Sequence, residues 1–429
     1  GRLDRQRQAV FAGKGQRRLW IPFGLFDDSK SVYAKWKFVR SLRVTARWLS
    51  GDREQSLQLT KVSFRRRKSL YLHTEVQSQA AEMGESVRYP VTVANCTDRN
   101  QAVKLSVERY GGETMTVEIE PSVLMLAPGE TKMVEVRVGI SERVAPGGFE
   151  SQVVHAVADG RGDEGERLEL TTLRKLPHPY VIMTESEWEG VRKKIAGNPQ
   201  MQDLLGMYTR RAEAWEVPEI RKDAPFLFET HHSHEAHNAI IVWKVTGRSE
   251  FAEKAALFLK RLVNPVNGYQ TTMRACHQQL VHEGEFFKHM AVVYDLLYDS
   301  AYLSEEDRRH TELCFRLYMD VIDGGMGMGN ISNWMLAELA GALYCSQALQ
   351  DRERMNRFLY GPGGLADQLA RGTFDDGWWY ECSVGYNLMA AGLFTEVSQS
   401  LRPWGINFAD IWVPASYSAE VSPGGGSRI

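Results

Sequence analysis

Two short segments of the chain combine aromatic, carboxyl and amide side chains with glycine, and both precede an apolar run. The first is DDGWWYECSVGYNLMA at 375–390, and the second is GGMGMGNISNW at 324–334. Glycine lets a backbone approach a ligand closely, and rings beside carboxylates are how proteins stack sugar faces while they bond the hydroxyls. The two segments therefore favour a saccharide cleft.

Helices must position these segments, because the periodicity is helical from about residue 184 onward. Thr184 with Glu187 forms a capping-box signature, and Ser304 with Asp307 forms a weaker one. The runs at 334–350 and 386–401 are apolar on nearly every side, whereas others are amphipathic. This alternation predicts a double-layered (α/α) toroid over residues 175–429. A solenoid of helical hairpins would look similar, but the chain has no fixed-period repeat.

Strands precede the helices. Short alternating segments such as VRYPVTVANCT and TKMVEVRVGI recur at regular spacing between 70 and 174, and they predict an Ig-like β-sandwich. Residues 1–69 hold a shorter run of alternation, which predicts a partial β-sandwich that could bind carbohydrate. The fold class is therefore multidomain, with N-terminal β-sandwich modules followed by an all-α toroid.

Composition narrows the classes of function. The 429 residues carry a formal net charge of -2, which disfavours nucleic acid as a partner because no global basic field is present. No apolar stretch is long enough to cross a bilayer. The five cysteines are scattered without CxxC spacing, which argues against a disulfide framework and a structural zinc site. The absent initial Met and the tail SPGGGSRI suggest a fragment of a longer protein.

Two stretches carry a family resemblance. NISNWMLAELAGALYCSQAL followed by DDGWWYECSVGYNLMAAGLF resembles the heparinase II/III and alginate lyase superfamily of polysaccharide lyases, and FFKHMAVVYDLLYDSAYLSEEDRR resembles an upstream helix pair. The resemblance spans roughly residues 180 to 410. It implies an (α/α) toroid followed by a C-terminal β-sandwich that is missing from this chain. It also implies β-elimination on a uronate-containing polysaccharide by a secreted, periplasmic or cell-surface enzyme.

The resemblance gives two residues a role. Asn333 matches the Asn that neutralises the substrate carboxylate, and Tyr386 matches the Tyr that acts as general acid and, in some members, as base. The chemistry is consistent, since an amide bound to the carboxylate stabilises the enolate-like state and a Tyr hydroxyl can protonate the departing oxygen. The structural alternatives are an N-cap for Asn333 and a core Tyr for Tyr386.

The identity of the catalytic base is left open. Many members of the superfamily have a catalytic His directly after that Asn, whereas this chain has Trp334 there. No His occurs after His310, so a His base would have to come from upstream, from the missing sandwich, or not exist. Upstream candidates are His277 and His282, with Arg274 as a carboxylate partner. The side chains expected to bind substrate are Arg274, Trp334, Trp378, Trp379, Glu381, His231 and His232.

Other chemistries remain as alternatives. A toroidal glycoside hydrolase would use Asp375 or Asp376 with Glu381, although residues of one loop make a poor flanking pair. A non-catalytic glycan-binding protein would use the rings alone. His234 and His237 beside Glu235 invite a metal, but HxxH without a third spaced ligand favours a capping cluster. The sequence predicts no metal, and it predicts no nucleotide or redox cofactor because no Gly-rich phosphate loop is present.

Overall fold

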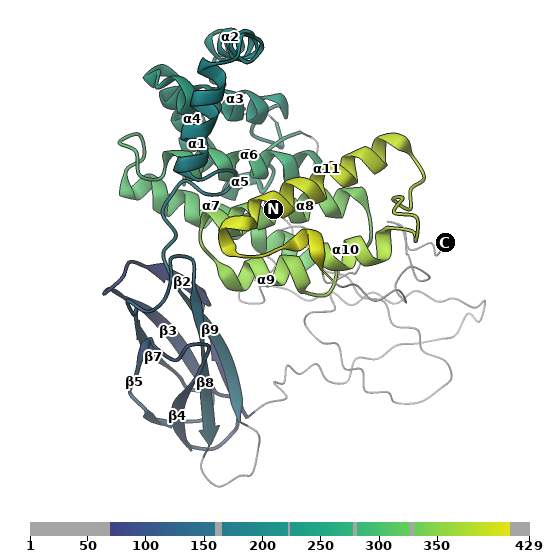
Figure 1. The fold of residues 1–429 in the computed structure, drawn as a ribbon. Coiled ribbons are helices and arrows are strands. Elements are labelled where there is room, and N and C mark those ends of the chain that lie inside the picture. The colour runs from purple at the N-terminus through teal and green to yellow at the C-terminus, as the bar shows by residue number, and fades with distance from the viewer. Residues whose placement is uncertain (1–68, 159–164, 222–223, 278–280, 327–329, 412–429) are drawn as a thin grey trace, which may run out of the picture.

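Strands and helices occupy separate parts of the chain. The computed structural model describes residues 69–158, 165–221, 224–277, 281–326 and 330–411 (Figure 1). The partial sandwich predicted for 1–69 falls outside these residues, apart from residue 69. The described strands run from Leu70 to Arg174, and the α-helices run from Glu185 to Ser400. The predicted order, a β region followed by a helical region, is confirmed.

Two sheets make up the β region. One has the order β1-β3-β7-β5 and the other has the order β2-β9-β8-β4-β6, and every neighbouring pair is antiparallel except β2 and β9. The strands are β1 (Leu70–His73), β2 (Ser78–Ala81), β3 (Ser86–Asn95), β4 (Gln101–Tyr110), β5 (Thr116–Glu120), β6 (Val123–Leu126), β7 (Thr131–Gly139), β8 (Phe149–Ala158) and β9 (Glu166–Arg174).

The inner faces of the two sheets share one core. Alternate residues of β3 and β7 are buried, as the alternation in the sequence predicts, and they pack with those of β4, β8 and β9. Tyr89 of β3 crosses between the sheets. Its hydroxyl donates to the carbonyl oxygen of Thr171 in β9 at 2.8 Å. Burial raises the pKa of Tyr89, so the group stays neutral and donates.

The linker, residues 175–184, joins the β region to the helices. Gln350 exchanges two hydrogen bonds with the backbone of Leu176, each of 2.8 Å. Asp295, near the end of α6, accepts from the backbone N–H of Tyr180 at 3.0 Å, and the Tyr180 hydroxyl donates to the carbonyl of Gln347, near the end of α8, at 2.7 Å. The linker therefore contacts the C-terminal ends of both helices.

The helical region comprises eleven described α-helices. They are α1 (Glu185–Ala196), α2 (Pro199–Ala214), α3 (His231–Thr246), α4 (Ser249–Leu262), α5 (Tyr269–Thr272), α6 (Val281–Leu297), α7 (Glu305–Met326), α8 (Asn333–Ala348), α9 (Arg352–Tyr360), α10 (Leu365–Gly372) and α11 (Val384–Ser400). Both predicted capping boxes are present, with Glu187 bonded to the Thr184 backbone and Asp307 bonded to the Ser304 backbone. Short 3-10 turns follow at Arg402–Trp404 and Phe408–Asp410.

Helices α6 and α8 form the centre of this region. They approach closely because each contributes a glycine to the contact. A Cβ at Gly284 would lie 2.3 Å from the carbonyl oxygen of Ala337, and one at Gly341 would lie 2.3 Å from that of Gly284. Helix α8 is buried along almost its whole length, as its apolar sequence predicts. The equally apolar α11 differs, because Val384 and Leu388 are exposed on a side that the described residues leave uncovered.

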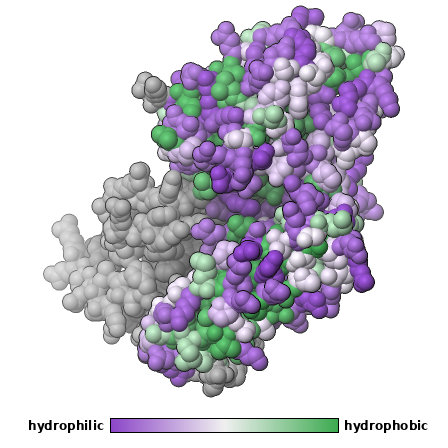
Figure 2. Space-filling view, turned by 90° about the vertical axis from the view of Figure 1, so that its left-hand side faces the viewer, coloured by the Kyte–Doolittle hydropathy of each residue, from purple (hydrophilic) through white to green (hydrophobic). Residues whose placement is uncertain are grey.

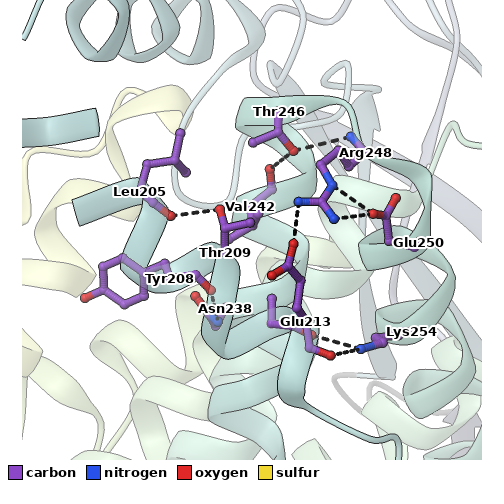
Figure 3. A network of polar contacts seen from close by, with 11 residues as sticks. Leu205, Tyr208, Thr209, Glu213, Asn238, Val242, Thr246, Arg248, Glu250 and Lys254 are labelled. Atoms are coloured by element: carbon purple, nitrogen blue, oxygen red, sulfur yellow. Dashed lines mark hydrogen bonds and ion pairs between the residues drawn. The ribbon is translucent and has the colours of Figure 1, made fainter. Parts of the chain in front are cut away.

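Polar contacts hold α2, α3 and α4 together (Figure 3). Lys254 of α4 donates to the carbonyl of Glu213 near the end of α2 at 2.9 Å, and Arg248 donates to the Glu213 carboxylate at 2.8 Å. Asn238 of α3 donates to the carbonyl of Tyr208 at 3.1 Å. These bonds help to fix α3, which carries the histidine-rich segment.

Hydrophilic side chains cover much of the face shown in Figure 2, with hydrophobic residues in scattered patches. Among the described residues, the helices are too short or too polar to cross a membrane.

Candidate functional site

Helices α3 and α6 run side by side in the same direction. At their starts, His277 Nδ1 lies 3.4 Å from the Thr230 hydroxyl. Further along both helices, the rings of His237 and His289 lie 4.7 Å apart. The N-terminal ends of α3 and α6 therefore lie together.

Helices α8 and α11 also run side by side in the same direction. Before their starts, the Tyr380 hydroxyl donates to the carbonyl of Ile331 at 2.9 Å. Towards their ends, Gln347 donates to the Ser400 hydroxyl at 3.0 Å. Since α6 also contacts α8 near its start and shares the linker with it at its end, the N-terminal ends of α3, α6, α8 and α11 are gathered on one side. We call this side the rim, and all the predicted site residues lie on or near it.

The segment before α11 is a folded turn. Gly377 adopts a φ of 85°, which favours glycine, and Thr373 forms a β-bridge with Trp379. The Trp379 indole donates to the Glu381 carboxylate at 2.6 Å. Trp379 is only 2% exposed, so its ring face is not open to a ligand, whereas Trp378 is 37% exposed and Tyr386 is 46% exposed. Within this segment, Trp378 and Tyr386 are therefore the aromatic residues that can present rings at the rim.

The side chain of Gln368, in α10, holds the turn before α8 in place. Its amide accepts from the Ser332 N–H at 3.2 Å and donates to the Asn330 carbonyl at 2.7 Å. The N-cap is Ser332, whose hydroxyl accepts from Met335 N–H, so the structural alternative for Asn333 as the cap is wrong. Asn333 is 5% exposed, and its side-chain amide bonds to none of the described residues. The neighbouring Trp334 is 54% exposed.

The segment before α6 pairs with the segment before α3. Phe228 N–H donates to the carbonyl of Ala275 at 3.0 Å, and Arg274 donates to the carbonyl of His277 at 3.1 Å. His277 is exposed and lies 3.6 Å from the Glu229 carboxylate. His282, the second residue of α6, is half-buried. The structure therefore brings Arg274 and His277 together beside the start of α3.

The two histidines that open α3 differ in environment. His231 is exposed, whereas His232 Nδ1 accepts from the Trp215 indole at 3.2 Å. Burial, and then the neighbouring His231, lower the pKa of His232. His232 is thus a neutral ring held by the core, and His231 is the better placed of the two to meet a substrate.

The metal alternative that the sequence offered, His234 and His237 beside Glu235, is not assembled in the structure. Glu235 forms an ion pair with Arg211 at 2.7 Å. His234 instead faces α6, where its ligand nitrogen lies within 4.8 Å of ligand atoms of Glu285 and His289. Sequence analysis missed these two residues, although their i, i+4 spacing on one helix face was a usable signal.

Two of the three carboxylates proposed for hydrolysis are engaged within their own loop. Asp376 accepts from the Trp378 N–H at 3.0 Å, and Glu381 accepts from the Trp379 indole. Hydrolysis needs two carboxyl groups on opposite sides of a sugar. This loop geometry gives the hydrolase alternative no support.

A cavity of about 560 Å³ lies away from the rim. It is lined by residues of the β region, by His178 of the linker, by Glu312 and Arg316 of α7, and by residues at the C-terminal ends of α6 and α8, including Tyr294 and Gln350. The cavity lies between the two parts of the molecule. It holds none of the residues predicted to do chemistry.

Comparisons with known proteins give little more. No family model and no curated protein match the chain. Among solved structures, it is similar to a FixG-related protein from Vibrio parahaemolyticus, with 12% identity, a TM-score of 0.20, and coverage of 25% of this chain and 95% of that one. It is also similar to a PapD-like domain of human CEP192, with 12% identity, a TM-score of 0.19, and coverage of 28% and 97%. A family 123 glycoside hydrolase from Clostridium perfringens matches at 9% identity, a TM-score of 0.21, and coverage of 34% and 36%. At these TM-scores the matches carry no argument.

Proposed function

We propose that the chain is the catalytic part of a polysaccharide lyase that cleaves a uronate-containing polysaccharide by β-elimination. The proposal includes an Ig-like β-sandwich followed by an (α/α) toroid, and it places the protein outside the cytoplasm, where such polymers occur. The observation that carries it is the rim. There, Asn333, Trp334 and Tyr386 lie at the starts of adjacent helices that run in one direction.

The rim suits an anionic polymer. Each helix start carries a partial positive charge from the helix dipole. Four such starts on one side add to the cation of Arg274, while exposed Trp334 and Trp378 offer faces for sugar rings. The molecule therefore needs no net positive charge to hold an acidic glycan.

The proposed chemistry divides the reaction between two side chains. Asn333 donates to the uronate carboxylate, which lowers the energy of the enolate-like state formed when the adjacent carbon loses its proton. Tyr386 protonates the glycosidic oxygen as its bond to carbon breaks, and a carbon–carbon double bond forms in the product. Asn333 is nearly buried, and a hydrogen bond there is stronger than one in water.

The proton acceptor is either ionised Tyr386 or an upstream histidine. His277 is exposed, and its Nδ1 lies 3.6 Å from the Glu229 carboxylate. His282 lies on the first turn of α6. In this proposal His277→Gln slows the reaction if His277 is the base and leaves it unchanged if Tyr386 serves both roles.

Ultraviolet absorbance of the unsaturated product tests the proposal on a panel of uronate polysaccharides. We expect absorbance to rise on at least one polymer and to be lost in Tyr386→Phe and Asn333→Ala. The matched control is Tyr360→Phe, since Tyr360 is an exposed tyrosine at the end of α9. A rise that survives Tyr386→Phe would contradict the assignment, and no rise on any polymer would contradict the lyase.

A further inference from the structure

Three side chains with metal-binding atoms meet between α3 and α6. His234 comes from α3, and Glu285 and His289 come from α6. Their ligand atoms all lie within 4.8 Å of one another, and His234 Nε2 lies 3.5 Å from the Glu285 carboxylate. Two imidazoles and one carboxylate form a common ligand set for a divalent transition metal. We propose that His234, Glu285 and His289 bind such an ion, with Zn²⁺ as the best match.

The hydrogen bonds around Ser233 fix the tautomer of His289. The Ser233 hydroxyl donates its only proton to the carbonyl of Thr230 at 3.0 Å. It must therefore accept from His289 Nδ1, which lies 3.3 Å away. Nδ1 carries the proton, so Nε2 carries the lone pair, as a metal ligand requires. A second residue that orients a ligating histidine in this way is typical of metal sites.

The backbone holds the three ligands on rigid elements. Glu285 and His289 are four residues apart, so they project from one face of α6. His234 projects from α3, which Asn238 ties to α2 (Figure 3). Sites built on packed helices keep their geometry better than sites on loops. Small side-chain rotations would therefore suffice to bring the ligand atoms to an ion.

The charges nearby do not prevent cation binding. Lys288 precedes His289 in α6, and its ammonium forms a 2.6 Å ion pair with Glu396 of α11. The ring of His237 lies 4.7 Å from that of His289, tilted by 32°, and His237 lies outside the set of three.

The ligands leave one side of the ion open. The His234 and Glu285 side chains are 39% and 37% exposed, whereas His289 is buried. An ion held by three protein ligands would thus have a fourth position facing solvent. Three ligands and an open position are the arrangement of catalytic rather than structural zinc. The inference does not depend on the lyase proposal, because it uses none of the residues assigned to elimination.

Calorimetric titration of the tag-free chain with ZnCl₂ tests this site, and Co²⁺ absorbance reports the geometry of the bound ion. We expect one ion per chain, with binding lost in Glu285→Gln and His234→Gln and weakened about 10- to 100-fold in Ser233→Ala.

His155→Gln is the matched control. His155 forms a 3.0 Å pair with Glu108 in the β region, but among the described residues it belongs to no group of three potential metal ligands. Circular dichroism of each variant checks that it folds. No binding to the wild-type chain, or binding that survives both Glu285→Gln and His234→Gln, would overturn the proposal. Loss of binding in His155→Gln alone would also overturn it.

Discussion

The Tyr380 hydroxyl donates a 2.9 Å hydrogen bond to the backbone carbonyl of Ile331, and both residues are buried. This bond ties the turn that leads to Tyr386 to the turn that leads to Asn333. Removing the hydroxyl in Tyr380→Phe should destabilise the fold by about 1 kcal/mol. It should also slow elimination, because Asn333 and Tyr386 would no longer be held at fixed positions relative to each other. Thermal unfolding and product absorbance measure the two effects.

Tyr318→Phe provides the control for that variant. The Tyr318 hydroxyl donates to the carbonyl of Glu338 at 3.1 Å within the helical core. Its loss should lower the melting temperature by a similar amount and leave turnover unchanged. If both variants lower turnover equally, the Tyr380 bond contributes stability alone.

The adjacent rings of Trp378 and Trp379 should have different effects on substitution. Trp378→Ala should weaken binding of a uronate oligosaccharide and cost less stability than Trp379→Ala, because Trp378 is 37% exposed and Trp379 only 2%. Trp379→Ala should cost about 3–5 kcal/mol of unfolding free energy, because its buried ring fills the space beside Gly372. Denaturant unfolding and oligosaccharide titration separate the two. Equal stability of both variants would contradict this assignment.

Glycine at 284 should be irreplaceable. A Cβ there would lie 2.3 Å from the Ala337 carbonyl, so Gly284→Ala must push α6 away from α8. The variant should unfold well below the wild-type melting temperature. Gly190→Ala in α1 is the matched control, because its Cβ would meet no atom within 4 Å. That substitution should stabilise the protein by up to about 1 kcal/mol, since alanine has the higher helix propensity. A melting temperature unchanged in Gly284→Ala would contradict the close approach.

Stability should fall in acid partly through His237. Burial, and then the nearby Lys288, lower the pKa of His237 from 6.5 to about 4. Between these values the unfolded chain binds a proton that the folded chain does not, so stability is lost as pH falls from 6.5 towards 4. The loss amounts to about 3 kcal/mol when complete. His237→Gln should flatten this dependence in denaturant unfolding measured from pH 7 to pH 4. An unchanged slope in the variant would contradict the buried, neutral ring.

The order of the elements could be predicted because local signals were strong. Alternation in β3 and β7, and the capping residues Thr184 and Ser304, each specify an element from a few neighbouring residues. The fate of α11 could not be predicted in this way. Its sequence is as apolar as that of α8, but burial depends on which other elements cover it, and that is a tertiary property.

The candidate site was predictable only in part. Glycines and rings mark the two segments at the rim, yet the outward turn of Trp378 and the inward turn of Trp379 depend on the β-bridge and on the bond to Glu381. The sequence also did not reveal which residues lie beside His234 in the fold. The sequence places Glu235 and His237 beside it, whereas Glu285 and His289 reach it only because α3 and α6 pack in parallel.

The claim that the chain cleaves by elimination is tested most directly by measuring whether cleavage adds water to the product. The polymer that gives a response is digested in oxygen-18-labelled water, and the newly formed chain ends are weighed by mass spectrometry. Elimination by Asn333 and Tyr386 adds no water, so the account predicts unsaturated ends without the label. One labelled oxygen per cleavage would mean hydrolysis and would contradict the account.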